Sequence, residues 1–298
     1  MHHIGILGLD TSHGEAFAEQ LSAHPATTLS HVWDSGTIRD KEYVDAFCDH
    51  HECVRVSKPM DLLDQVDAVM VLTLDWNQHA SLARPFLAAG LPVMIDKPLA
   101  GSIAQVRTIS NALQSGEARL FGGSVLPFAP PMQSLSVGSP GRRIVLAGYD
   151  DPFYYGAHLT DLTSYLIDSP WTRVEPRAGS RKEVSAHFEN DANATLILDG
   201  PTDTPGFGVL DVADRTKTVF LPAGEGAFDP AYRQYVGAFV DVIEGTQKYA
   251  TRVCDAARLL VATVVAHEET RVVHRGEEAL ETYEVDSEAF IAGYEPYY

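Results

Sequence analysis

The sequence predicts an α/β protein built from a doubly wound parallel sheet and a second, α+β domain with an open, largely antiparallel sheet. Two observations predict this architecture. Strand-like and helix-like segments alternate up to Gly122, whereas beyond Gly123 strand-like segments follow one another with few helices between them. We therefore expect one domain over residues 1–122 and a second over residues 123–298.

The composition is that of a globular protein with a strong negative charge. The chain has 298 residues, of which 45% are hydrophobic and 21% charged, and its formal net charge at pH 7 is −19. Binding to phosphate-rich partners requires clustered lysine and arginine. We therefore expect neither nucleic acid nor an anionic membrane surface as a partner.

The start of the chain predicts a cytoplasmic protein. Met1, His2 and His3 lead directly into the strand-like residues 4–8, with no long apolar stretch before a cleavage site. The rest of the sequence contains no apolar run of the length that a membrane-spanning helix needs.

Six strands are expected in the N-terminal domain. Residues 3–9 are apolar and bounded by glycine, which is typical of a buried strand, and residues 66–73 are apolar on both faces, as parallel strands tend to be. The strands that the pattern predicts are residues 3–9, 27–34, 54–57, 66–73, 92–96 and 118–123.

The helices of this domain have local start signals. Ser12 and Glu15 have the spacing of a capping box, which predicts a helix that begins at Ser12. Ser102 is expected to cap a later helix, and Pro85 is expected to kink the helix between them or delay its start.

The C-terminal domain is expected to be rich in antiparallel strands. Residues 142–150, 183–187, 194–199 and 209–221 have strand patterns without helices between the last three. A helical stripe contains Leu159, Leu162 and Leu166, and two later stripes predict further helices. These later stripes are Val236, Phe239, Val240 and Ile243, and Ala257, Leu260, Val261 and Val264.

Four short motifs, in order along the chain, resemble those of a known family. They are Gly5-Ile6-Leu7-Gly8; Asp67-Ala68-Val69 followed by His79; Asp96-Lys97-Pro98-Leu99-Ala100; and Gly156-Ala157-His158-Leu159-Thr160-Asp161. In these motifs the chain resembles the glucose–fructose oxidoreductase, inositol dehydrogenase and MocA (Gfo/Idh/MocA) family over essentially its whole length. The third motif resembles the family's Glu-Lys-Pro signature, with aspartate in place of glutamate.

The resemblance implies an N-terminal Rossmann domain that binds NAD(P) and a C-terminal domain that binds substrate and assembles the oligomer. It implies hydride transfer between the cofactor and a secondary alcohol of a sugar, cyclitol or polyol derivative, at a site between the domains. A homodimer or homotetramer formed through the C-terminal sheet is also implied.

The turn expected to bind the cofactor departs from the Gly-x-Gly-x-x-Gly pattern. Gly8 matches the first glycine, but Asp10 and His13 stand at the second and third positions. A carboxylate at Asp10 would repel a pyrophosphate unless it is protonated or hydrogen-bonded. The backbone N–H groups at Thr11, Ser12 and His13 still offer donors to a phosphate at the start of a helix.

Other residues are expected along the cofactor. Asp34 ends the second predicted strand, where a carboxylate suits a ribose 2′-hydroxyl and repels a 2′-phosphate, so NAD is favoured over NADP. The resemblance further places Thr73, Leu74, His79, Asp96 and Lys97 at the cofactor. Trp76 replaces part of the family's usual turn, and either stacks on a ligand or fills a gap between the domains.

The expected catalytic residues are Lys97, His158, Tyr154 and Asp161. By resemblance, Lys97 and His158 move the alcohol proton while the cofactor takes the hydride. Burial in a cleft lowers the pKa of a lysine and enables acid–base work, and histidine has a suitable intrinsic pKa. Asp161 shares a helix face with His158. Tyr154 stands where the family usually has aspartate, and is a weak base at neutral pH.

Two alternatives to a dehydrogenase remain open at this point. One is a non-redox lyase, isomerase or hydrolase that uses Asp10, His13, Lys97 and His158 as acid–base groups. The other is a binding or regulatory protein without chemistry. The turn from Gly8 to Gly14 distinguishes a dehydrogenase from both alternatives, because only a dehydrogenase needs this turn to bind a dinucleotide.

No metal is expected. Asp10, His13, His79 and His158 have donor atoms that suit zinc, but their spacing is not that of a known zinc site. Residues 48–53, Cys-Asp-His-His-Glu-Cys, resemble a ligand cluster but lack a second half elsewhere, which favours a helix end and loop.

Overall fold

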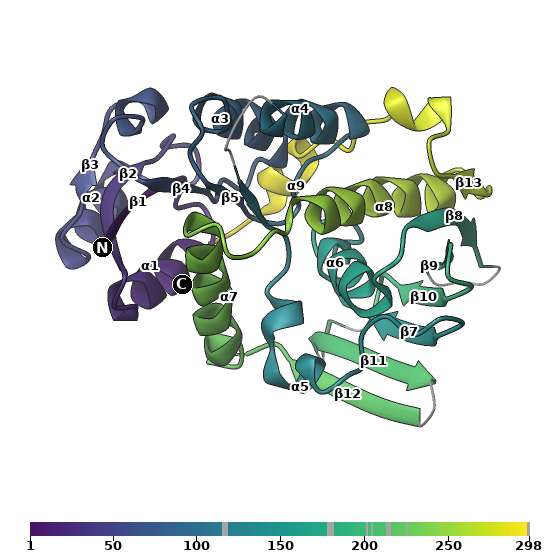
Figure 1. Ribbon diagram of the computed structural model, residues 1–298. Helices are drawn as coiled ribbons and strands as arrows, with labels where there is room; N and C mark the ends of the chain where they lie inside the picture. The colour runs from purple at the N-terminus through teal and green to yellow at the C-terminus, as the bar shows by residue number, and fades with distance from the viewer. Residues whose placement is uncertain are drawn as a thin grey trace.

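The computed structural model describes residues 1–114, 119–177, 182–200, 202–203, 205–212, 216–224 and 226–296. Two sheets form the framework of the molecule (Figure 1). The first sheet carries the N-terminal part of the chain. The second lies at the other end of the molecule, and the long helix α8 (Ala250–Glu268) runs between the two.

The first sheet confirms the predicted doubly wound topology. All its strand pairs are parallel, and its order is β3-β2-β1-β4-β5-β6. The chain therefore changes direction of winding between β1 and β4, and ligands bind such folds in the crevice beyond the strand ends at this point. The strands are β1 (His2–Leu7), β2 (Thr27–Trp33), β3 (Val54–Arg55), β4 (Ala68–Val71), β5 (Val93–Ile95) and β6 (Leu120–Gly122).

Helices cover both faces of this sheet. Their apolar sides pack on the strands, as in α1, which buries Phe17, Ala18 and Leu21. The helices are α1 (His13–Ala23), α2 (Lys41–His50), η1 (Pro59–Leu62), α3 (Trp76–Ala88) and α4 (Ile103–Leu113). Residue 118, at the start of the sixth predicted strand, lies outside the described residues.

Local start signals predicted the helices with mixed success. The Ser102 hydroxyl accepts a hydrogen bond from the Gln105 N–H, so the predicted cap is confirmed. The predicted capping box at Ser12 is wrong, because the Ser12 side chain makes no cap hydrogen bond. The Glu15 carboxylate instead bonds with the Tyr43 hydroxyl and with the His51 ring, which lie outside α1. Pro85 lies inside α3 without delaying its start.

The second sheet is mostly antiparallel, as predicted. Its order is β12-β11-β7-β10-β9-β8-β13, and β7 and β10 form its parallel pair among the described residues. The single strand predicted over residues 209–221 is wrong: two antiparallel strands, β11 and β12, cover this range, and residues 213–215 between them are not described. The strands are β7 (Arg143–Ala147), β8 (Trp171–Pro176), β9 (Glu183–Phe188), β10 (Asn193–Ile197), β11 (Gly206–Val212), β12 (Thr216–Pro222) and β13 (Val273–His274).

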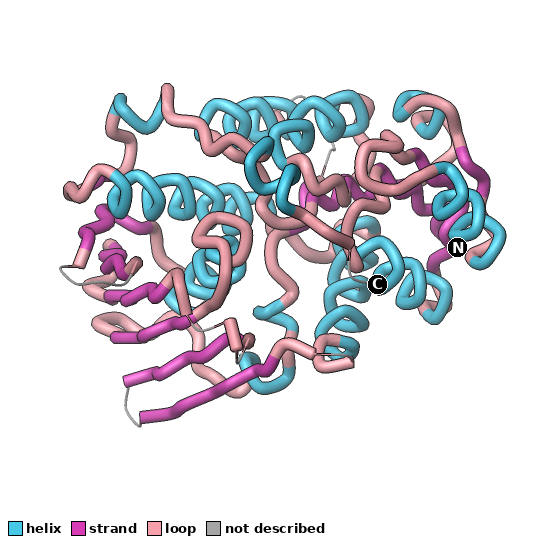
Figure 2. Tube along the Cα trace, turned by 180° about the vertical axis from the view of Figure 1, so that it is seen from behind, coloured by secondary structure: helices cyan, strands magenta, loops and turns pink. Residues whose placement is uncertain are grey.

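The C-terminal helices connect the two sheets. Helix α8 packs on α6 and on β8 and β9 of the second sheet, and also on α4 and β6 of the first. Helix α7 packs on α1, so it returns to the N-terminal part of the chain. In the view from behind, none of the helices that the structure describes covers the opposite face of the second sheet (Figure 2). The remaining elements are η2 (Leu126–Phe128), α5 (Pro130–Gln133), α6 (Gly156–Ile167), α7 (Asp229–Ile243), η3 (Glu278–Glu281) and α9 (Glu288–Gly293).

Within the described ranges, no helix combines the length and the apolar character needed to cross a membrane. The domain boundary near Gly122 and Gly123 stays a prediction. It lies at the end of β6, where the chain leaves the first sheet for η2.

Candidate active site

The turn after β1 packs closely against the end of β4. Gly8 has a φ of +93°, and a Cβ atom on it would lie 2.6 Å from Thr73 Cγ2 and 2.9 Å from Thr73 Cα. Glycine is therefore required here by the left-handed backbone and by the lack of space. Gly8 and Thr73, both predicted cofactor residues, meet at this contact.

Asp10 lies at the centre of this turn and is buried. Its Oδ2 accepts a hydrogen bond from the Leu74 N–H at 2.7 Å, which ties the turn to the segment after β4. Burial raises the pKa of Asp10 to about 7, and the neighbouring Asp34 adds to the shift, against the opposing effect of the Leu74 bond and Arg39. Near pH 7 a large fraction of Asp10 is therefore uncharged, which weakens its repulsion of a phosphate.

Asp34 follows β2 as predicted, and main-chain donors hold its carboxylate. Oδ2 accepts from the Leu9 N–H at 2.8 Å, and Oδ1 accepts from the Gly36 N–H at 2.7 Å. The carboxylate thus fixes the turn after β1 relative to the loop after β2. Each oxygen keeps acceptor capacity for a further donor.

Lys97 follows β5 and is almost fully buried, at 5% exposure. Its Nζ lies 3.1 Å from the centre of the Tyr154 ring and 5.3 Å from that of Tyr155, in a cation–π arrangement. Burial lowers the pKa of Lys97 to about 7, although Asp96 and Asp151 act in the opposite direction. Lys97 can therefore exchange a proton at neutral pH.

His158 lies in the first turn of α6, and its Nδ1 shares a 2.7 Å hydrogen bond with the Ser124 hydroxyl. Its pKa lies well below the usual value, because burial and then the positive charges of Lys97 and His13 disfavour the imidazolium. His158 is therefore a neutral ring at pH 7.

Asp161 lies one turn further along α6 and supports the loop after β6. Its Oδ2 accepts from the Ser124 N–H at 3.0 Å, and its Oδ1 lies 3.7 Å from Arg252 Nε. Burial raises the pKa of Asp161, and Arg252 partly offsets this effect. Through Ser124, this carboxylate positions the hydrogen-bond partner of His158.

His13 and Asp96 form a buried pair that the sequence did not predict as a pair. His13 Nδ1 lies 2.7 Å from Asp96 Oδ2, and the side chains of the two residues are 10% and 3% exposed. Although burial acts to raise it, the pKa of Asp96 is lowered, because His13 and Lys97 lie beside the carboxylate. Only the fold brings the two residues together, since they follow different strands.

Some of these side chains meet at a cavity of about 770 Å³ between the two sheets, whereas Asp161, a predicted catalytic residue, does not line it. Lys97, His158, Tyr154, Thr11, Ser12 and His13 all line it, so most of the predicted catalytic residues and part of the predicted cofactor turn come together. Its far wall comes from the second sheet and α7. The other residues that line it are Ala16, Val125, Tyr149, Tyr155, Pro205, Phe207, Ala223, Gly224, Gly226, Phe228, Asp229 and Tyr232.

His79 lies outside this cavity and has no exposed surface. Its Nδ1 lies 2.9 Å from the Pro98 carbonyl oxygen, and its Nε2 lies 2.8 Å from that of Thr73. The ring thus connects the segments after β4 and β5 beneath the site. Burial lowers the pKa of His79.

The predicted candidates for metal binding do not converge. His79 is turned to main-chain carbonyls, and His13 to Asp96. Among the residues that the structure describes, no group of three or more histidine, cysteine, aspartate or glutamate side chains has the geometry to hold a metal ion.

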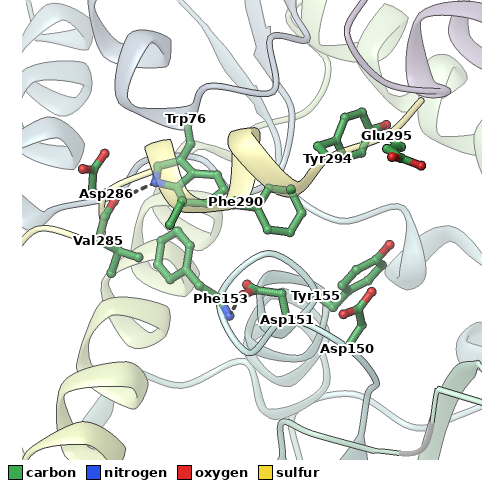
Figure 3. A pocket seen from close by; sticks show the side chains of 12 residues that line it. Trp76, Asp150, Asp151, Phe153, Tyr155, Val285, Asp286, Phe290, Tyr294 and Glu295 are labelled. Atoms are coloured by element: carbon green, nitrogen blue, oxygen red, sulfur yellow. Dashed lines mark hydrogen bonds between the residues drawn. The ribbon is translucent and has the colours of Figure 1, made fainter. Parts of the chain in front are cut away.

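A C-terminal segment that the sequence did not single out lies against this site. Phe290 of α9 stacks on Tyr154 with ring centres 4.4 Å apart. The Phe290 ring also lies 5.6 Å from the ring of Trp76 (Figure 3). The Trp76 Nε1–H donates to the Val285 carbonyl at 2.8 Å. Trp76 therefore packs against the chain's own C-terminal segment. The aromatic residues near the end of the sequence were the available signal, but they do not identify their partners.

Together, the fold and the cavity define a class of protein. A doubly wound parallel sheet is joined to an open, mostly antiparallel sheet, and ionisable residues from the carboxyl edge of the first sheet face a cavity between them. This is the architecture of a two-domain, dinucleotide-dependent oxidoreductase.

Comparison with known proteins agrees with this class. Residues 2–124 match the GFO_IDH_MocA family, described as an oxidoreductase family with an NAD-binding Rossmann fold. The match supports the predicted resemblance to this family and covers the N-terminal part of the chain, which carries the first three of the four motifs.

A curated relative and two solved structures share further features. Inositol 2-dehydrogenase 1 of Saccharopolyspora erythraea is 27% identical over 240 residues, which are 64% of this chain and 71% of that protein. The structure of myo-inositol 2-dehydrogenase from Lactobacillus plantarum aligns with a TM-score of 0.76 at 14% identity, over 92% of this chain and 99% of that one. Scyllo-inositol dehydrogenase from Lactobacillus casei, with bound NAD(H) and scyllo-inositol, aligns with a TM-score of 0.76 at 13% identity, over 92% and 99%. These two structures show a shared fold.

The residues of this chain fit NAD at the turn and in the cavity. Gly8 allows the close turn, and Thr11 and Ser12 bring the start of α1 to the cavity wall. The cavity volume lies within the roughly 300–1,000 Å³ of typical ligand sites. Between the ends of β1, β2 and β4, however, the space is only about 30 Å³, because Ile291 of α9 lies there beside Asp10.

The lowered pKa of Lys97 predicts a pH-dependent change in stability. Between pH 7 and 10.5 the unfolded chain holds a proton on this lysine that the native protein has lost, so the free energy of unfolding rises with pH across this window. The slope is at most about 1.4 kcal/mol per pH unit. Lys97→Met removes this contribution.

Guanidinium unfolding at several pH values measures the effect. The free energy of unfolding of the wild type, minus that of Lys97→Met, is expected to rise from pH 7 to 10 and to be constant below pH 7. Lys58→Met, at an exposed lysine, serves as the control and should follow the wild type. Parallel curves for Lys97→Met and the wild type would show that Lys97 keeps an ordinary pKa.

Proposed function

We propose that this protein is an NAD-dependent dehydrogenase that oxidises a secondary alcohol of a cyclitol, sugar or related polyol. The observation that carries the proposal is the position of Lys97. A buried lysine with a pKa of about 7 follows β5 and faces the same cavity as His158 and the start of α1. The relatives named above are inositol dehydrogenases, which supports a redox reaction over a lyase, isomerase or hydrolase.

The residues proposed to hold NAD lie along the carboxyl edge of the first sheet. Gly8, Thr11 and Ser12 would bind the pyrophosphate through the turn and the start of α1. Asp34 would accept hydrogen bonds from the ribose hydroxyls and repel a 2′-phosphate, which favours NAD over NADP. Asp10 would tolerate the pyrophosphate in its uncharged form. Bound NAD supplies the acceptor for the hydride.

In the proposed reaction, the side chains of the cavity bind and orient the alcohol and take its proton. Lys97 in its neutral form accepts the hydroxyl proton, which its lowered pKa permits at pH 7. His158, neutral and fixed through Ser124, orients the alcohol by a hydrogen bond. Tyr154 covers the Lys97 amine and limits its contact with water. Asp161 acts through Ser124 as a positioning residue.

Oxidation of cyclitols tests this function. The purified protein is incubated with NAD⁺ and with myo-inositol, scyllo-inositol or hexoses, and NADH formation is followed by absorbance. Activity is expected with at least one of these alcohols, and Lys97→Met should lower kcat/KM by about 10²–10⁴-fold. Lys58→Met is the control for loss of a lysine. If no alcohol is oxidised and NADH does not bind at millimolar concentration, the dehydrogenase proposal is wrong.

We also propose that the protein forms a homodimer or homotetramer through the second sheet. The face of β11 and β12 away from α6 and α8 exposes Leu210, Val212 and Phe220, at 37%, 47% and 56%. The pairing register places these three side chains on one side of the sheet. Exposed apolar side chains that gather in this way mark association surfaces. A cytoplasmic location stays a prediction.

Light scattering after size-exclusion chromatography tests the assembly. The wild type is expected to have the mass of a dimer or tetramer, and Phe220→Glu the mass of a monomer, because a buried unpaired charge opposes association. Val137→Glu adds the same charge at another exposed apolar residue, and should keep the wild-type mass. A monomeric wild type contradicts the proposal.

A further inference from the structure

The cavity contains two histidines, and they differ in how well they can hold a positive charge. A basic group that takes the alcohol proton becomes positively charged, and in this site the basic residues are buried. The imidazolium of His158 would face a neutral hydroxyl, Ser124, and the charge of Lys97 opposes it. The imidazolium of His13 would face the carboxylate of Asp96 at 2.7 Å.

The geometry also orients His13 for proton transfer. An ionised carboxylate only accepts hydrogen bonds, so the hydrogen on the neutral ring lies on Nδ1, between His13 and Asp96. This leaves Nε2 with the free lone pair. Among the described residues, no hydrogen bond to Nε2 is formed, and the side chain of His13 lines the cavity. The edges of Phe17 and Tyr232 pack against the ring and fix its plane.

We propose that His13, held by Asp96, is the histidine that shares the proton transfer with Lys97, in place of His158. This rests on the proposed dehydrogenase function. The alcohol loses its hydroxyl proton to Lys97 or His13 Nε2 and its carbinol hydride to bound NAD⁺, which leaves a ketone and NADH. Asp96 stays ionised throughout, and His158 only orients the substrate. The Asp96 carboxylate thus lies beside both basic groups, His13 and Lys97, and offsets the positive charge that either gains.

Chemical rescue tests this assignment, with the inositols and hexoses as substrates. His13→Ala should lower kcat by about 10²-fold or more with little change in KM, and added imidazole should restore part of the loss. His158→Ala should lower kcat less, and imidazole should not restore it. Asp96→Asn should lower kcat while the protein stays folded. The opposite ranking, or no rescue of His13→Ala, overturns the proposal.

Nitrogen NMR of the protein without ligands gives a readout that does not depend on turnover. The His13 ring should be protonated on Nδ1 and bare on Nε2, and Asp96→Asn should remove this preference. If the wild type oxidises no alcohol, the dehydrogenase function fails, but this measurement still decides the His13–Asp96 pair. If Nδ1 of His13 is unprotonated in the wild type, His13 does not donate a hydrogen bond to Asp96 and the proposed pair is wrong.

A separate observation concerns the C-terminal segment of residues 285–296. Ile291 of its helix α9 lines the small cavity at the ends of β1, β2 and β4, where the winding of the first sheet changes direction. Ile291 shares the remaining cavity of about 30 Å³ with Asp10 and Thr73, and Phe290 covers Tyr154. A dinucleotide needs this crevice for its adenosine half.

The segment is anchored at one end, and beyond the anchor Phe290, Ile291 and Tyr294 are only partly buried where they pack against the core. The anchor is made by main-chain and buried contacts: Val285 N–H donates to the Gly101 carbonyl at 2.9 Å, and the Ser287 hydroxyl donates to Asp75 Oδ1 at 2.5 Å. Beyond Ser287, no residue of α9 is buried. Residues of α9 and of the segment that contains Asp151 and Phe153 together line a cavity of about 580 Å³. Few buried apolar contacts favour local opening.

We infer that residues 288–296 form a lid that occupies the adenosine half of the cofactor crevice and swings about Ser287 when NAD binds. This rests on the proposed use of NAD. The closed lid lowers the apparent affinity by the fraction of molecules that are open. It also shields the Tyr154 ring, and hence Lys97, until the cofactor arrives.

Titration with NADH, followed by its fluorescence, tests the lid in three variants. A chain that ends after Ser287 and the variant Phe290→Ala should both bind NADH about tenfold tighter than the wild type. Val137→Ala, at an exposed residue of another segment, should bind like the wild type. If the shortened chain fails to fold, Phe290→Ala alone still tests the lid.

Hydrogen exchange in the wild type gives a second measure, since residues 288–296 should exchange faster when NADH is bound. If the wild type and both variants bind NADH with equal affinity, the lid proposal is wrong, whereas the dehydrogenase proposal is unaffected. If neither the wild type nor the variants bind NADH, the lid and the cofactor proposal both fail.

Discussion

The site depends on one buried carboxylate, Asp96, which follows β5 at the carboxyl edge of the first sheet. A carboxylate with 2% exposure is costly unless nearby groups compensate its charge. His13 and Lys97 provide that compensation: His13 comes from the start of α1, and Lys97 is the next residue along the chain. The charge of Asp96 therefore links the turn after β1 to Lys97, whose protonated form it favours against the effect of burial.

The two halves of the predicted cofactor path differ physically. At the cavity, Lys97, His158 and His13 already line the space, and its volume is that of a typical small-molecule site. At the crevice near Asp10, the chain's own Ile291 takes the space and Asp34 is engaged by two main-chain amides. The reactive half is thus formed in advance of ligand binding, whereas the adenosine half requires the C-terminal segment to move.

The sequence predicted the first sheet well, because period, length and glycine positions are local properties. It also predicted that Lys97 and His158 would face one cavity, because each lies in a motif of the family that the chain resembles. It did not predict that β11 and β12 divide the range 209–221, since both strands share one apolar pattern. Nor did it predict the pairing of His13 with Asp96 or the placement of Phe290 on Tyr154. Those contacts join residues far apart in the chain, and only the completed fold defines them.

Two features of the crevice have a common physical basis: Asp10 stands where the Gly-x-Gly-x-x-Gly pattern has its second glycine, and the C-terminal segment lies beside it. A glycine at position 10 would leave an open backbone surface, whereas Asp10 fills that space and must be desolvated to lie there. Burial raises the pKa of Asp10 to about 7, and Ile291 lines the small cavity beside the carboxylate. When Ile291 leaves, water returns to the carboxylate and favours its charged form, while an approaching pyrophosphate favours the uncharged form. These two effects on the Asp10 carboxyl oppose each other. The turn therefore binds a dinucleotide only if the phosphate keeps Asp10 protonated after Ile291 has moved away.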